Sequence, residues 1–251
     1  MLSSRRKVLS IVLLLILSTS GVLLSQVRAG ASFLKILPGA RTESMASAQT
    51  AELDDIHSLF ANPACIGLLR EWYSSASYTK WIADVYQASL LFNKKISNPL
   101  SRQTRFALGI LYQGIPDFDS SDMATPTASA NDLLISLSIG QKIPQNSNLF
   151  SIGISLKYLH SRLDTYTASS LIFDSGLIAR TPRFKLGLSF LKYGIISAGV
   201  SLTQLGTSLK FDQENTPLPQ TLRTGMASVS YTHLRAHETS LHLVCRLLLE
   251  K

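Results

Sequence analysis

The sequence has few charged residues and few cysteines for its 251 residues. Charged side chains make up 16% of the chain, against about 25% in an average soluble domain. Two cysteines, Cys65 and Cys245, are too few for a disulfide framework or a thiolate metal site. Long apolar runs are lacking beyond the N-terminus, so the 45% hydrophobic content must be spread over short pieces, as strands would spread it.

Motifs that carry catalysis or cofactor binding are also lacking. The sequence has no G-x-S-x-G nucleophile elbow, Walker loop or dinucleotide-binding glycine motif. The adjacent Asp54 and Asp55 suit helix capping better than a shared acid–base role. Asp117, Asp119 and Asp122 resemble part of a calcium loop, but the bidentate glutamate is missing. We therefore predict no catalytic residue, no cofactor and no metal ion, in a chain that is not an enzyme.

Residues 1–29 have the three parts of an export signal. Arg5-Arg6-Lys7 forms a basic start, and an almost wholly apolar run follows over residues 8–24. Val27-Arg28-Ala29 then places small or modest side chains before a cleavage site at Gly30. We predict a helical signal peptide that is cleaved there. A retained anchor helix is the alternative, because residues 8–27 are uncharged and about 20 apolar residues can span a bilayer.

Large apolar side chains alternate with small or polar ones from about residue 70 to residue 228. The segments Phe150–His160 and Ile195–Leu205 are clear examples, with Ser, Gly or Thr at most of the intervening positions. A period of two predicts strands whose large side chains all lie on one face. The other face carries few charges, which favours a membrane barrel over a soluble sandwich. We therefore predict an all-β fold, an antiparallel outer-membrane β-barrel over residues 70–228.

Three further features complete this arrangement. Residues 30–69 are mixed in character and predict a small N-terminal plug segment inside the barrel. The polar stretch 117–131 predicts a long outward loop. Trp72, Tyr73, Tyr78 and Trp81 suit either an aromatic girdle at a membrane interface or ordinary strand packing.

The plug segment contains Phe33-Leu34, Gly39-Ala40-Arg41, Met45, Asp54-Asp55 and Asn62-Pro63-Ala64. This series resembles the opening motif of the PorV/PorQ family of outer-membrane proteins, relatives of the FadL-type transporters. The family pattern has a Phe-Leu pair, Gly-Ala-Arg, a Met flanked by glycines, Asp-Asp and a Trp-Asn-Pro-Ala element. Ser44 and Ser47 replace the glycines around the Met, and Ala61 replaces the Trp. The matching residues are Phe33, Leu34, Gly39, Ala40, Arg41, Met45, Asp54, Asp55, Asn62, Pro63 and Ala64.

A second stretch resembles the Leu-Gly, Lys-Phe, Leu-Pro and Leu-Arg-x-Gly series of the same family. Gln204 stands where the family usually has Asn before Leu-Gly. We expect both sets of matching residues to be structural. Those of the barrel motif are Leu205, Gly206, Lys210, Phe211, Leu218, Pro219 and Gly225.

The resemblance implies a FadL-like barrel in the bacterial outer membrane and a non-catalytic role. One implied role is a type IX secretion component that docks secreted cargo proteins or other machinery subunits. The alternative is a FadL-like channel for hydrophobic small molecules. Outer-membrane lipid is the expected partner in both cases. Nucleic acid is not expected, because the formal charge of +8 lies largely outside residues 30–228 and no basic cluster is interleaved with aromatics.

Residues 229–251 look foreign to the rest of the chain. They read VSYTHLRAHETSLHLVCRLLLEK and resemble a translated sequencing adapter. We therefore expect a C-terminally truncated barrel that ends at Ser228, followed by a non-native tail. His233 and His237 have the spacing of zinc ligands on a helix, but as part of this tail they predict no metal site.

Overall fold

The computed structural model describes residues 30–52, 54–69, 72–98, 101–119, 127–143, 149–185, 193–211 and 214–231. The predicted signal peptide lies outside the described residues, as does the tail beyond residue 231. Residues 229–231, the start of the expected tail, form the end of the last strand. Among the described residues, no helix is long and apolar enough to cross a membrane.

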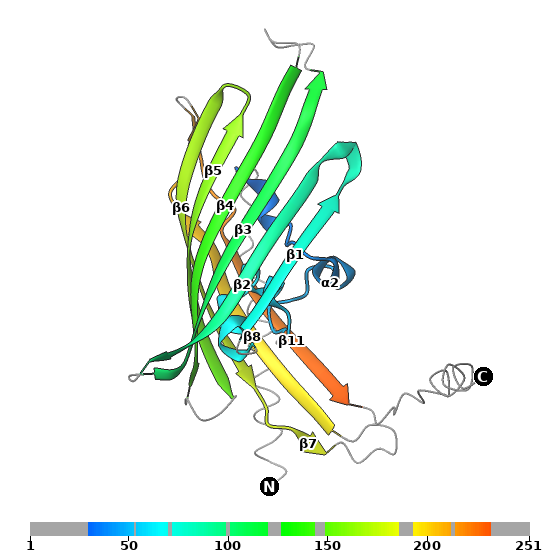
Figure 1. Cartoon of the computed structure of the whole chain (residues 1–251), viewed down its shortest axis with the longest axis vertical. Helices are drawn as coiled ribbons and strands as arrows, with labels where there is room; N and C mark the ends of the chain where they lie inside the picture. The colour runs from blue at the N-terminus through cyan, green and yellow to red at the C-terminus, as the bar shows by residue number, and fades with distance from the viewer. Residues whose placement is uncertain are drawn as a thin grey trace, which may run out of the picture.

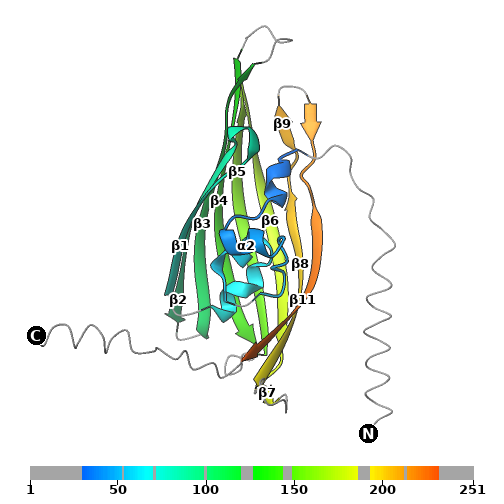
Figure 2. The same ribbon diagram turned by 90° about the vertical axis from the view of Figure 1, so that its right-hand side faces the viewer.

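Eight strands form one curled antiparallel sheet with the shape of half a barrel (Figures 1 and 2). Each strand pairs with the next along the path, which confirms the prediction of an antiparallel β fold. The path runs through β1 (Trp72–Lys80), β2 (Tyr86–Asn98), β3 (Ser101–Asp119), β4 (Thr127–Ile143), β5 (Phe150–Leu163), β6 (Tyr166–Arg180), β8 (Tyr193–Gly206) and β11 (Thr221–Tyr231).

Four short elements lie off this path. β7 (Phe184–Lys185) pairs with the start of β8. β9 (Leu209–Phe211) and β10 (Glu214–Thr216) form a separate hairpin between β8 and β11. The short 3-10 helix η5 (Ile82–Asp84) connects β1 to β2.

The connection between β3 and β4 corrects one prediction. Residues 117–131 were expected to form a long loop, but β3 continues to Asp119 and β4 begins at Thr127. Phe118 pairs with Ala128, after a register shift beyond Ile115. The backbone therefore completes its hydrogen bonds as a ladder, and the hairpin projects past its neighbours (Figure 1).

The two faces of the sheet differ in the way that the alternation predicts. Along β5, Ile152, Ile154 and Leu156 are exposed, whereas Ser151 and Gly153 between them are buried. Leu137 on β4 is 59% exposed and Leu171 on β6 is 57% exposed. The convex face thus carries large apolar side chains, and the concave face is mostly small or polar, with buried leucines such as Leu134 and Leu159 among them.

Aromatic side chains gather on the outer face near one end of β1, β2 and β3. Tyr78 stacks on Tyr86 with ring centroids 6.4 Å apart, and Tyr86 lies 5.9 Å from Tyr112. Trp72 is 70% exposed at the opposite end of β1, and Tyr73 packs inward against the core. Three of the four predicted aromatics, including Trp81, are therefore exposed, and only Tyr73 contributes to packing inside the curl.

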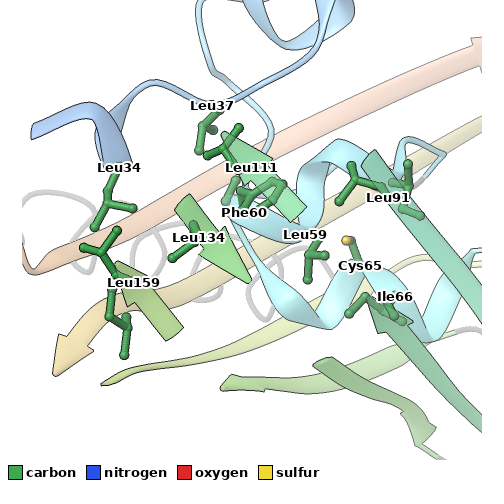
Figure 3. Close-up of a cluster of buried hydrophobic side chains, with 14 of the residues drawn as sticks. Leu34, Leu37, Leu59, Phe60, Cys65, Ile66, Leu91, Leu111, Leu134 and Leu159 are labelled. Carbon is green, nitrogen blue, oxygen red and sulfur yellow. The ribbon is translucent and has the colours of Figure 1, made fainter. Parts of the chain in front are cut away.

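The plug segment, residues 30–69, lies inside the curl of the sheet (Figure 2). It consists of short turns of helix: η2 (Ser32–Lys35), α2 (Ala40–Ser44), η3 (Ile56–Phe60) and η4 (Pro63–Leu68). Its apolar side chains meet inward-facing leucines of the sheet (Figure 3). Leu59, Cys65 and Ile66 of the plug and Leu91 and Leu159 of the sheet are fully buried. One core therefore holds the two parts together.

The close fit of plug and sheet predicts that side chains cannot be added at the contact. An added Cβ at Gly153 would lie within 3.0 Å of the backbone of Pro63 and Ala64. We expect Gly153→Ala to lower the free energy of unfolding by about 1–3 kcal/mol, as measured by urea titration of the refolded chain.

Gly109→Ala is the matched control for this measurement. The atom nearest to an added Cβ there is the end of the Leu91 side chain, at 2.8 Å, and this group can rotate away. Equal losses in the two variants would show that backbone contact is not what limits residue size at Gly153.

Candidate functional site at the plug interface

A row of glycines crosses the concave face from β4 to β11. Gly140 pairs with Gly153, and Gly153 pairs with Gly176. Gly199 and Gly225 continue the row on the last two strands, where they pair with each other. The row removes side chains from one band of the sheet, so backbone from another segment can approach closely.

The plug backbone occupies this band. The Gly67 nitrogen lies over Gly140, and the Pro63 carbonyl lies over Gly153. An added Cβ would come within 3.0 Å of plug atoms at Gly140, Gly153, Gly176 and Gly199, and would be 3.0 Å from Thr50 at Gly225. The plug backbone therefore packs directly on the glycine row.

Serine side chains beside the row donate hydrogen bonds to plug carbonyl groups. Ser151 donates to the carbonyl of Ala64 at 2.6 Å. Ser197 donates to Ala51 at 2.8 Å, and Ser201 donates to Ala61 at 2.6 Å. Short helical turns leave carbonyl groups without partners, and a buried carbonyl needs one. The sheet thus supplies the hydrogen bonds that the irregular plug cannot make within itself.

Longer side chains act in the same way at the two ends of the plug. The Arg105 guanidinium donates to the carbonyl of Gly67 at 2.7 Å. Gln204 donates through Nε2 to the carbonyl of Leu34, also at 2.7 Å. The plug is therefore tied to the sheet at both ends and in its middle.

Asn62 joins plug and sheet at the centre of the interface. Its side chain is fully buried and accepts the N–H of Ala64 at 3.0 Å, which caps helix η4. Its Nδ2 donates to the carbonyl of Thr50 at 2.8 Å and approaches that of Leu177 at 3.3 Å. A single amide therefore satisfies a helix end, a plug turn and a strand.

Gln204 stands at a kink in β8. Its φ of 65° is left-handed, and the pairing of β8 with β6 shifts register there. Its backbone N–H, freed from the ladder, donates to the Asp174 carboxylate at 2.7 Å. Thr221 of β11 donates to its side-chain oxygen at 3.1 Å. Few non-glycine residues adopt this conformation.

A buried ion pair lies beside this kink. The Lys157 ammonium on β5 pairs with the Asp174 carboxylate on β6, and the two side chains are 4% and 0% exposed. The ammonium also lies 5.2 Å from the ring centroid of Phe60 in the plug. Its charge is therefore matched by one carboxylate from β6 and one aromatic face from η3.

A second polar group lies within the plug. The Asp55 carboxylate accepts the backbone N–H of His57 at 2.9 Å, which caps η3 and confirms the expected capping role for Asp55 of the Asp54–Asp55 pair. It lies 3.0 Å from the His57 ring and accepts Gln49 at 3.0 Å. Burial alone would raise the pKa of Asp55, but these contacts with His57 and Gln49 together lower it. The arrangement stabilises a charged carboxylate and fixes a turn.

The predicted plug motif does not form one cluster. Gly39 adopts a φ of 106° and contacts the His57 ring, where an added Cβ would lie 2.8 Å away. Arg41 is exposed and pairs with Glu52 at 3.0 Å. Asn62 and Pro63 meet the glycine row. Ala40 and Asp54 are exposed.

The predicted barrel motif gathers near the β9–β10 hairpin, with one exception. Leu205 and Gly206 end β8, and Lys210 and Phe211 lie in β9. Leu218 and Pro219 are buried just before β11. The exception is Gly225, which lies on β11 at the end of the glycine row and faces Thr50.

The interface contains one thiol among the described residues. Cys65 is fully buried, and burial raises the pKa of its thiol. No three His, Cys, Asp or Glu side chains of the described part gather as metal ligands. The cavity between η2 and the sheet is lined by Leu34, Leu37, Phe60 and Lys157, and it is about the size of one water molecule. The arrangement holds a segment in place.

Several residues of this site were not predicted from the sequence. Lys157 occupies an inward position of the alternating segment Phe150–His160, where its neighbours are small. A lone charge on a small-residue face is a signal for a buried partner, although the pattern does not identify Asp174 as that partner. The glycines were visible as small residues, but their alignment depends on strand register.

The comparisons with known proteins identify no relatives. A scan against protein-family models gave no match, and a search of the curated proteins also gave no match.

The buried ion pair yields a test of the coupling between strands and plug. Lys157→Met leaves the Asp174 carboxylate buried without its cation, which should cost about 3–5 kcal/mol of unfolding free energy. Lys157→Met/Asp174→Asn should cost less than the two single substitutions together, because Asn is neutral and still accepts the Gln204 N–H. Urea titration of the four chains gives the coupling energy. Additive losses would mean that the two charges do not stabilise each other.

Proposed function

We propose that this chain belongs to an outer-membrane β-barrel protein whose lumen is occupied by its own N-terminal plug. The observation that carries the proposal is the convex face. Thirty-one large hydrophobic side chains of the described residues are exposed, most of them on this face. Soluble monomers rarely expose apolar patches beyond a few hundred Å². Lipid is the solvent that such a face fits, and the polar, occupied concave face fits a barrel interior.

Two other features support a membrane setting. Aromatic residues lie on the outer face at both ends of the strands, as in the girdles of membrane barrels. The sheet also pairs its backbone groups strand by strand between its two edge strands, β1 and β11, as a segment of a closed membrane barrel would. Export through the predicted signal peptide is part of the same proposal.

Within this class, we favour the role of a PorV/PorQ-type component of type IX secretion that docks secreted cargo without catalysis. The fixed plug supports this choice, because hydrogen bonds, an ion pair and a shared core hold it to the sheet. A protein that docks cargo needs no open path through its lumen. The projecting β3–β4 hairpin provides a surface beyond the rim for such docking.

A FadL-like channel for hydrophobic small molecules is the second candidate. The inner apolar cluster favours it, because Leu34, Leu111, Leu134 and Ile172 surround the small cavity beside the plug. The cavity is too small for such a ligand in this conformation. Transport would therefore require movement of the plug.

Substituting a convex-face residue tests the membrane proposal. We expect Leu137→Arg, in the middle of β4, to cost about 2–4 kcal/mol of folding free energy in lipid, and Ile143→Arg, at the strand end, about 0–1 kcal/mol. Both positions are exposed, so in water both substitutions would be nearly neutral. Urea titration in lipid vesicles gives the values. A chain that folds as a monodisperse species in buffer without detergent, with Leu137→Arg neutral, would contradict the proposal.

A second experiment separates docking from transport. The β3–β4 hairpin beyond Ile115 is replaced by a tight turn in a membrane-inserted barrel, and the Asp164–Thr165 turn is replaced as the control. Docking predicts that the first variant loses cross-links to secreted proteins and that the control keeps them. Transport predicts uptake of an apolar fluorescent probe into vesicles and no cargo cross-links in any variant.

A further inference from the structure

Gly30 contacts a part of the chain almost two hundred residues away. Its backbone nitrogen donates a hydrogen bond to the carbonyl of Pro217 at 2.9 Å. An added Cβ at Gly30 would lie 2.8 Å from the methyl group of Thr216 and 3.5 Å from Leu209. Residue 30 is thus held between the end of β10 and the side of β9, where a larger side chain would meet Thr216.

This contact lies at the margin of a closed apolar cluster. Leu209 begins β9 and Leu218 follows β10, and they are 0% and 2% exposed. They belong to the same core as Phe33 and Leu34 of η2, the first helical turn of the plug. Gln204 fixes the base of the hairpin by donating to the carbonyl of Leu34. The hairpin and the start of the plug therefore pack as one unit.

The sequence independently predicts a cleavage site directly before the same residue, Gly30. Val27-Arg28-Ala29 has the form of a signal-peptide cleavage site, with Gly30 directly after it. Hydrolysis by a signal endopeptidase would break the Ala29–Gly30 amide bond. The oxygen of the water molecule would bond to the carbonyl carbon of Ala29, which becomes a carboxylate. Both protons of the water would go to the nitrogen of Gly30, which becomes an ammonium group.

We propose that the new amino terminus at Gly30 is bound by the carbonyl of Pro217, so that leader removal fastens the β9–β10 hairpin to the plug. The inference rests on the exported state in the proposed function. An amide N–H at Gly30 donates one hydrogen bond. An ammonium group at the same place offers three protons and a full charge, and charge-assisted hydrogen bonds are about twice as strong as neutral ones.

The test compares three chains refolded in the same lipid vesicles: one starting at Gly30, one starting at Arg28, and one starting at an acetylated Gly30. Hydrogen exchange of the β9 and β10 amides reports opening of the hairpin. We expect exchange in the chain with a free Gly30 amine to be about fivefold slower than in the other two. Acetylation keeps the N–H and removes the charge, so it isolates the charge as the cause.

Gly30→Val provides a second measurement. The larger side chain meets Thr216, so we expect fast exchange of the hairpin whether or not the terminus is free. Equal exchange rates in the first three chains would overturn the inference, as would a processed amino terminus at another residue, determined by mass spectrometry of the exported protein. The folded fraction in the same vesicles measures insertion. A barrel that inserts but lacks the contact between Gly30 and Pro217 is therefore distinguished from a chain that does not insert.

Discussion

The structure depends on the close approach of plug backbone to a band of the sheet without side chains. The aligned glycines from Gly140 to Gly225 make this approach possible. Neighbouring serines such as Ser151 and Ser201 donate hydrogen bonds to the carbonyl groups of the plug. The glycine band and the serine donors are both needed. A glycine band without donors would bury unsatisfied carbonyls, and serine donors without the band would be held out of reach.

The apolar core follows from the same contact. Its members come from both plug and sheet: Ile56 and Leu59 lie in short helical turns, and Leu111 and Leu134 point inward from strands. The plug is too short to bury a core of its own. The curled sheet, for its part, would expose these inner leucines without the plug. Each part thus completes the other, and the buried Lys157–Asp174 pair lies where they meet.

The alternation of large apolar and small polar residues gives the two faces of the sheet different characters. Along one strand, every second residue faces outward and is large and apolar, and the residues between face the plug. Small polar residues suit the inside because they leave room for backbone and donate hydrogen bonds to it. Large apolar residues outside suit the lipid of the proposed membrane setting. The proposed membrane setting and the plugged interior therefore follow from one pattern.

The sequence by itself determined the strands and their faces, because a period of two depends only on neighbouring residues. It also marked the plug segment and, through the resemblance, Asn62 and Gly39. Only the tertiary structure decided the rest. Residues 117–131 look like a loop by composition, yet strand pairing continues to Asp119 on one side and begins at Thr127 on the other, after the shift beyond Ile115. The glycine alignment, the kink at Gln204 and the partner of Lys157 all depend on strand register, which is set by contacts between distant segments.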